Sequence, residues 1–203
     1  MPTNLPPVVV LCGGQGTRLA KVLPEGMPKC LADINGEPFI VLLESRLVAA
    51  GFRDIIYATG YGHDKVVATL AMVYRSEAHQ PRRHFSRETE PLGTLGAVKL
   101  AADTYQDLLS GDFVVVNGDT ICDVDYNAIL AYHHGQESEV TVACDNYNTP
   151  VGVFIFTGFL METIPTGKND ITDIENKFYT DAPFYDIGTP EGLSALKKYV
   201  AGV

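Results

Sequence analysis

The sequence predicts an α/β fold with a mostly parallel sheet. Short apolar runs alternate along the chain with longer segments whose apolar residues recur at helical spacing. The two most apolar runs, VVVLC at 8–12 and DFVVVNGD at 112–119, each lead into a glycine and polar residues. In an open parallel sheet such polar ends lie at the carboxyl edge, where ligands bind.

The first half of the chain contains three such alternations. Residues 8–12 form an apolar run bounded by glycines and predict a buried strand. The segment 38–51 begins with Pro38, ends with Gly51 and predicts the first helix. We expect further strands at 54–60 and near 84–85, and further helices at 63–74 and 94–105.

In the second half, a strand at 112–119 is followed by a helix at 125–134 and strands at 139–144 and 151–156. We also expect a short helix at 159–164 and a C-terminal helix at 190–200, which has proline at its start. The stretch 165–184 is polar and without period, and we interpret it as irregular and as a candidate lid.

Length and composition indicate one globular domain over residues 1–203, because 203 residues that are 46% hydrophobic can bury a sizeable core. No apolar run approaches the ~20 residues of a membrane span, and no basic region precedes a signal-type segment. We therefore expect a cytoplasmic protein without a membrane partner.

Charge and cysteine content exclude other classes. A net charge of −10 argues against nucleic acid as a partner, because binding to the phosphate backbone needs clustered cations. The four cysteines form no C-x-x-C pair and have no histidine at metal spacing, so we expect buried thiols and neither a disulfide framework nor a zinc site.

The segment LCGGQGTRL at 11–19 is the first candidate for chemistry. Its glycines let the backbone approach a ligand closely, and its N–H groups can face phosphate or base. It matches neither G-x-G-x-x-G nor Walker A, and an ordinary glycine-rich turn is the alternative. Arg18 would add a cation that neutralises phosphoryl charge, unless it is a plain surface residue. Lys29, eleven residues on, would be a second cation near the same phosphates.

Five blocks, in this order, resemble the signatures of the nucleotide-sugar pyrophosphorylase family: GGQGTRL, PKCLADINGEPFI, EPLGTLGAVK, VVNGD and FYDIGTPEGL. RETEPLGT at 87–94 is most similar to bacterial D-glycero-α-D-manno-heptose 1-phosphate guanylyltransferases. The resemblance implies a Rossmann-like three-layer sandwich, the nucleotide-diphospho-sugar transferase fold. It also implies Mg²⁺-dependent transfer of a nucleoside monophosphate, GMP from GTP, to a sugar 1-phosphate.

The resemblance also implies roles for individual residues. Arg18 and Lys29 would be catalytic, and Asp119 and Asp186 would hold Mg²⁺. Asp119 also closes an apolar strand, where a carboxylate is well placed for a hard cation, although either aspartate can instead cap a turn. The nucleotide would contact Cys12, Gly13, Gly14, Gly16, Thr17, Glu88, Pro91, Leu92, Gly93, Thr94, Asn117 and Gly118. The sugar side would be formed by Asn148, Gly152 and Lys168.

The chain departs from the family pattern on the sugar side. The family's E-K-P-like lysine segment is replaced by the short DNYNTP before 151–156. Lys168 and Lys177 are the possible substitutes, although a solvated lysine is the plainer interpretation of each. The alternatives are a mannose or other hexose 1-phosphate as substrate, or a catalytically silent nucleotide-sugar-binding subunit. The sequence leaves open whether the chain forms a homo-oligomer.

Overall fold

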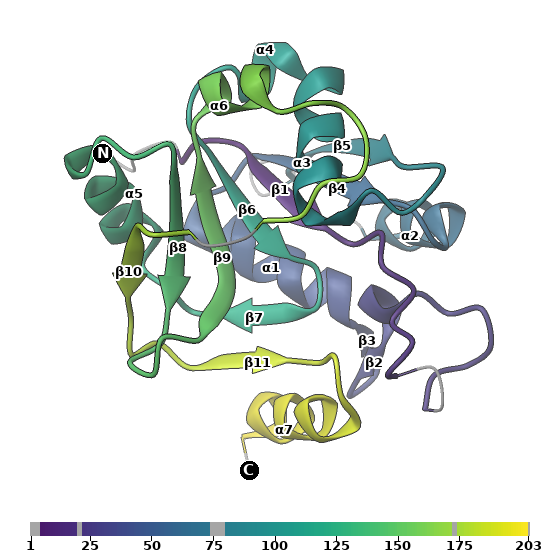
Figure 1. The fold of residues 1–203 in the computed structure, drawn as a ribbon. Helices are drawn as coiled ribbons and strands as arrows, with labels where there is room; N and C mark the ends of the chain where they lie inside the picture. Colours follow the sequence, from purple (N-terminus) through teal and green to yellow (C-terminus); the bar gives the residue numbers. More distant parts are fainter. Residues whose placement is uncertain (1–4, 20–21, 74–79, 172–173, 203) are drawn as a thin grey trace.

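The computed structural model describes residues 5–19, 22–73, 80–171 and 174–202. They form a seven-stranded sheet with helices packed on it (Figure 1). The strand order is β10-β8-β9-β6-β1-β4-β5. The strands are β1 (Val8–Leu11), β4 (Asp54–Thr59), β5 (Arg82–Arg87), β6 (Phe113–Asn117), β8 (Val140–Cys144), β9 (Pro150–Phe156) and β10 (Lys177–Tyr179).

The sheet is mostly parallel, as predicted. β6, β1, β4 and β5 run parallel to one another, and β10 runs parallel to β8. Only β9 differs within this sheet, because it is antiparallel to both of its neighbours, β6 and β8. The carboxyl ends of β1, β4, β5 and β6 therefore meet at one edge.

Helices cover both faces of the sheet and make the predicted three-layer sandwich (Figure 1). Buried residues of α1, α2 and α5 belong to the larger core cluster on one face, and those of α3, α4 and α6 to the cluster on the other. The helices are α1 (Phe39–Ala50), α2 (His63–Ala71), α3 (Gly93–Thr104), α4 (Gln106–Leu109), α5 (Tyr126–Gly135), α6 (Gly158–Thr163) and α7 (Pro190–Ala201).

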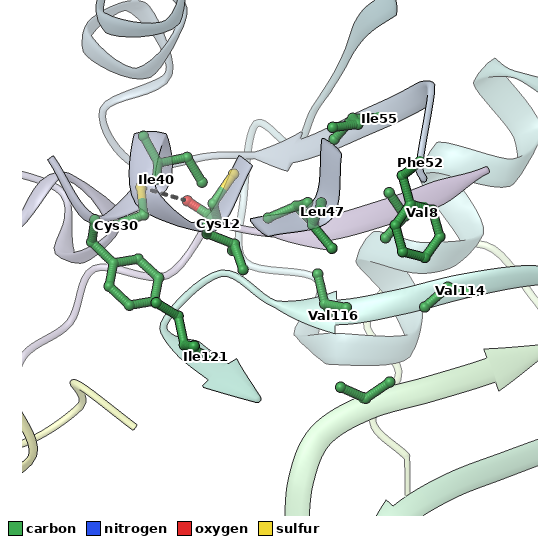
Figure 2. Packing of buried hydrophobic residues seen from close by; sticks show 14 of the residues in the cluster. Val8, Cys12, Cys30, Ile40, Leu47, Phe52, Ile55, Val114, Val116 and Ile121 are labelled. Atoms are coloured by element: carbon green, nitrogen blue, oxygen red, sulfur yellow. Dashed lines mark hydrogen bonds between the residues drawn. The ribbon is translucent and has the colours of Figure 1, made fainter. Parts of the chain in front are cut away.

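The apolar runs supply both clusters because strand side chains alternate between the two faces. Val8 and Val10 belong to the larger cluster, and Val9 between them belongs to the other. Figure 2 shows the larger cluster, in which Leu47 of α1 lies over the β1 and β6 valines. Buried on both sides, β1 reads as a continuous apolar run rather than an alternating one.

A buried ion pair ties α1 to the sheet. Glu44 has no exposed surface, and it accepts hydrogen bonds from Arg83 Nε at 2.6 Å and Arg83 Nη2 at 2.8 Å. The Tyr57 hydroxyl donates to the same carboxylate at 2.7 Å. Burial and the neighbouring Glu44 charge raise the pKa of Tyr57 well above its usual value.

Helix boundaries follow the predicted signals closely. α1 begins after Pro38 and ends at Gly51, whose φ of 119° is in the left-handed region that glycine tolerates. α7 begins with Pro190, and the Thr189 hydroxyl accepts the Gly192 N–H. None of the helices in the described ranges is long and apolar enough to cross a bilayer.

Several short elements differ from the prediction. The stretch 165–184 is not wholly irregular, because it contains β10 and the first residue of β11 (Phe184–Asp186). β11 pairs antiparallel with β7 (Thr120–Cys122), and β2 (Asp33–Ile34) pairs with β3 (Glu37–Pro38). The helical turn η1 (Lys29–Leu31) precedes β2. Strands of two or three residues are too short to show a hydrophobic period in the sequence, and they form because they pair with a neighbouring strand.

The four cysteines are free thiols, three of them buried. Cys12 and Cys30 lie in the larger core cluster, where the Cys30 thiol contacts the Cys12 carbonyl oxygen at 4.0 Å (Figure 2). Their role in the fold is that of small apolar side chains.

Candidate active site

The glycine-rich loop follows β1 at the carboxyl edge of the sheet. Gly13 and Gly14 line two adjoining cavities. Cys12 does not line either cavity: its N–H donates to the Ala58 carbonyl at 2.9 Å, and its side chain lies in the larger core cluster. Thr17 and Arg18 are exposed on the loop.

The first cavity, of about 360 Å³, has Glu88 in its wall together with Gly60 and Pro91. A methyl group on Gly13 would lie 2.6 Å from Glu88 Oε1, so this carboxylate needs glycine beside it. Glu88 Oε2 accepts the Leu92 N–H at 3.2 Å. Burial raises the pKa of Glu88, and the Leu92 N–H opposes this by favouring the charged form.

The second cavity, of about 370 Å³, shares Gly13, Gly14, Glu88 and Pro91 with the first and reaches Asp119. Asp119 follows β6, and its carboxylate forms an ion pair with Lys29 Nζ. Gly16, at φ 65°, packs against the stem of Lys29, since a methyl group there would lie 2.7 Å from Lys29 Cβ. The loop and Lys29 are thus fixed to one another.

Asp186 lies beside Asp119 through the pairing of β7 and β11. Asp186 is opposite Thr120 in the ladder, and the Ile187 N–H donates to the Asp119 carbonyl at 2.9 Å. Asp186 Oδ1 accepts the Gly188 N–H at 2.6 Å. A methyl group on Gly188 would lie 2.8 Å from Asp186 Oδ1 and 3.1 Å from Arg18 Nη2, so Arg18 reaches the same place.

A third cavity, of about 330 Å³, lies on the other side of Thr94 and Asn117, which line both it and the second cavity. Asn148 and Lys177 add polar groups to walls that are otherwise mainly apolar. Gly152, at φ 78°, lies under the Asn117 amide, since a methyl group there would lie 3.1 Å from Nδ2. The three cavities together form one trough along the carboxyl edge.

The remaining predicted residues occupy defined places. Gly93 lines the second cavity. Gly118 is buried, and its N–H donates to the Leu11 carbonyl at 2.9 Å. Lys168 is exposed and lines none of these three cavities, whereas Lys177 lines the third.

Gly60 and Asp170 are among the residues of the trough that were not predicted. Gly60 directly follows β4. Its position at the carboxyl end of an apolar run would have allowed it to be predicted from the sequence. Asp170, which lines the second cavity, carried no such signal, because a long-range contact brings it there. Among the described residues no group of three or more His, Cys, Asp or Glu is arranged to hold a metal ion.

A family model for nucleotidyl transferases matches residues 7–151. The chain belongs to the nucleotidyl transferase family. It is 36% identical over 152 residues to a mannose-1-phosphate guanyltransferase from Emericella nidulans, and 34% identical over 145 residues to one from Yarrowia lipolytica. These matches cover 72% and 70% of this chain. The chain spans only about two fifths of the length of these relatives, since 40% and 38% of their sequences are matched.

Solved structures of the nucleotidyl transferase fold match nearly the whole chain. HddC from Yersinia pseudotuberculosis superposes with a TM-score of 0.80 at 26% identity, over 97% of this chain and 100% of HddC. The HddC structure complexed with GMP-PN gives a TM-score of 0.81 at the same identity. The Rossmann-like sandwich expected from the sequence is therefore confirmed.

Proposed function

We propose that this nucleotidyl transferase moves GMP from GTP to a sugar 1-phosphate and releases pyrophosphate. The observation that carries the proposal is the trough. It has the Glu88 carboxylate at one end, the glycine loop and Asp119 with its partner Lys29 at its centre, and a compartment lined by Lys177 beyond. Arg18 and Asp186 lie close to Gly188, next to this centre. Likeness over 97% of the chain to an HddC structure that holds GMP-PN supports the choice of nucleotide.

Glu88 is the residue proposed to recognise guanine. A carboxylate can accept hydrogen bonds from both N1–H and the 2-amino group of that base. Its Oε1 lies between Gly13 and Gly60, where a methyl group on either glycine would lie 2.6 or 2.7 Å away. The glycines thereby make room for this carboxylate, which the Leu92 N–H holds in place and which lines both adjoining cavities.

Asp119 and Asp186 are proposed to hold Mg²⁺. The donor set fits, because Mg²⁺ takes one or two carboxylates and fills its other positions with phosphate oxygens and water. The Ile187 N–H bond to the Asp119 carbonyl makes the backbones of the two segments adjacent, which supports the proposal. When bound, the metal would neutralise charge on the phosphates. Lys29 forms an ion pair with Asp119. When nucleotide and metal bind, the Lys29 ammonium would therefore leave this carboxylate and bind a phosphate oxygen.

The proposed chemistry is an in-line displacement. A sugar 1-phosphate oxygen forms a bond to the α-phosphorus of GTP, the bond from that phosphorus to the bridging oxygen of the β-phosphate breaks, and pyrophosphate leaves with the electron pair. The attacking oxygen is already anionic, so no protein base is required. Arg18, Lys29 and the loop N–H groups then contribute positioning and charge neutralisation.

The sugar is assigned to the third cavity. Asn148, and Asn117 above Gly152, offer hydrogen bonds there, and Lys177 rather than Lys168 is proposed to bind the sugar phosphate because it lines the cavity. We favour D-glycero-α-D-manno-heptose 1-phosphate, on the strength of the RETEPLGT resemblance. Mannose 1-phosphate is the second candidate, favoured by the 36% identity to the Emericella nidulans guanyltransferase. The working compartment is proposed to be the cytoplasm.

A pyrophosphate-release assay tests the proposal. GTP, ATP, UTP and CTP are each offered with heptose 1-phosphate, mannose 1-phosphate and glucose 1-phosphate, with Lys29→Met as the inactive control. We expect release with GTP and a manno-configured sugar. Release with none of the twelve pairs would indicate a silent nucleotide-binding subunit, and preference for UTP or CTP would refute the role of Glu88.

A further inference from the structure

A strap formed by residues 167–170 crosses the N-terminal end of α3. The Asn169 N–H donates to the Leu92 carbonyl at 2.8 Å, and the Gly96 N–H donates to the Asn169 carbonyl at 3.1 Å. These bonds join the strap to the loop before α3 and to the first turn of the helix. The strap is part of the stretch interpreted from sequence as a candidate lid.

Two glycines of α3 leave room for the strap. A methyl group on Gly93, at φ 74°, would lie 2.4 Å from Asp170 Oδ1, and one on Gly96 would lie 2.4 Å from the Gly167 carbonyl oxygen. Real side chains do not tolerate such distances, so glycine at both positions permits the contact. The G-T-L-G sequence of this block thus has a local reason: it lets the strap lie directly on the helix.

The contact places the Asp170 carboxylate in the second cavity. Asp170 Oδ1 accepts the Thr94 N–H at 2.9 Å, an N-terminal helix position that favours a negative charge. Asp170 is exposed, and the same cavity is also lined by Glu88 and Asp119. Among the described residues Asp170 forms no ion pair, whereas Asp119 is paired with Lys29.

A carboxylate beside a triphosphate is unfavourable unless it faces a hydrogen-bond donor or a cation, because charges of like sign repel. The proposed Mg²⁺ site uses Asp119 and Asp186, so Asp170 is left to face a hydrogen-bond donor. With the base at Glu88 and the phosphates at the glycine loop and Asp119, the ribose falls between them, where Asp170 lines the cavity. A ribose offers two adjacent hydroxyl donors, and a carboxylate is a double acceptor that proteins use to bind this diol.

We propose that Asp170 accepts hydrogen bonds from the ribose hydroxyls of the nucleotide and so selects ribonucleotides over deoxyribonucleotides. The inference rests on the proposed function, because it assumes a nucleotide in the trough. Oδ1 remains on the Thr94 N–H, and Oδ2 receives the 2′-hydroxyl. Nucleotide binding would thereby stabilise the docked position of the strap on α3, and the docked strap would strengthen nucleotide binding.

The test compares GTP with 2′-deoxy-GTP, as dissociation constants from calorimetry and as kcat/KM. The wild-type protein should favour GTP by about 10–100-fold, the scale of a hydrogen bond to a charged group. In Asp170→Ala this preference should fall to within about threefold of unity, and Asp170→Asn should fall between. Asn169→Ala is the matched control, because it removes the strap's bond to the Pro165 carbonyl at 3.0 Å and leaves the carboxylate in place.

The ratio separates recognition from a merely structural role. If Asp170 only anchors the strap, Asp170→Ala and Asn169→Ala will weaken both nucleotides equally and the preference will survive, which would overturn the inference. Equal binding of the two nucleotides by the wild-type protein would also overturn it. Failure of the proposed function looks different: the nucleotides bind with the expected preference, but no sugar 1-phosphate releases pyrophosphate. If Asp170→Ala does not fold, Asp170→Asn gives the same readout.

Discussion

Replacing Lys29 by Met should change two measured quantities in opposite directions. Met keeps the unbranched stem that packs against Gly16, and removes the charge that pairs with Asp119. Turnover should fall by about 10²–10³-fold, the scale for losing one preorganised donor to a transition-state charge. Affinity for Mg²⁺ or Mn²⁺ without nucleotide should rise by about 10–100-fold, because the cation no longer competes with an ammonium for the carboxylate.

The structure also limits the effect of this change on folding. The Lys29 and Asp119 side chains remain 18% and 19% exposed, and Asp119 lines a cavity, so it can be hydrated. We expect the free energy of unfolding to change by less than about 1 kcal/mol.

Calorimetric titration with Mn²⁺ and a pyrophosphate-release assay measure the two effects. Lys65→Met is the matched control, because Lys65 Nζ donates to the Gly26 carbonyl at 2.6 Å and does not pair with Asp119. Unchanged metal affinity in Lys29→Met would refute competition between the lysine and the metal. Near-normal turnover would remove Lys29 from the chemistry.

Five further outcomes are expected. Glu88→Gln should lower kcat/KM for GTP by about 10–100-fold. In the wild-type protein, burial raises the pKa of Glu88, so GTP affinity should fall on acidification at a pH above the ordinary glutamate pKa of about 4.3. A GTP affinity that does not change with pH would contradict this. Gly13→Ala should raise KM for GTP, since its methyl group would lie 2.6 Å from Glu88 Oε1; an unchanged KM would exclude Glu88 from base binding. Arg83→Leu should reduce stability by about 1.5–3 kcal/mol, measured by urea denaturation, because it removes the two hydrogen bonds that Arg83 donates to the buried Glu44 carboxylate. EDTA should abolish turnover and Mg²⁺ restore it, and activity in chelator would exclude a metal role.

Sequence reasoning recovered the fold because its main elements carry local signals. The apolar runs of β1 and β6 and the Pro38 and Gly51 boundaries of α1 are properties of single segments. β10 was missed because three residues show no period, and its partner β8 lies more than thirty residues away in the chain. The antiparallel direction of β9 depends likewise on its neighbours.

The residues of the site also fall into two groups: those with a local signal in the sequence and those that a distant contact places there. The glycine loop, Arg18, Lys29 and Asp119 stand at ends of elements that sequence could locate, and the resemblance added Glu88 and Asp186. Asp170 could not be found, because only the docking of the strap on Gly93 and Gly96 brings it to the trough. The choice of Lys177 over Lys168 also required the position of β10.

The edge position of β10 bears on how such a protein changes its substrate during evolution. β10 has one neighbouring strand, β8, whereas the glycine loop emerges from β1, an interior strand between β6 and β4. A substitution near Lys177 disturbs few other contacts, but one near Gly13 propagates into the core. The β10 side of the compartment proposed to bind the sugar is therefore where we expect substitutions to cost least stability, whereas the compartment proposed to bind the nucleotide is bounded by interior strands of the sheet.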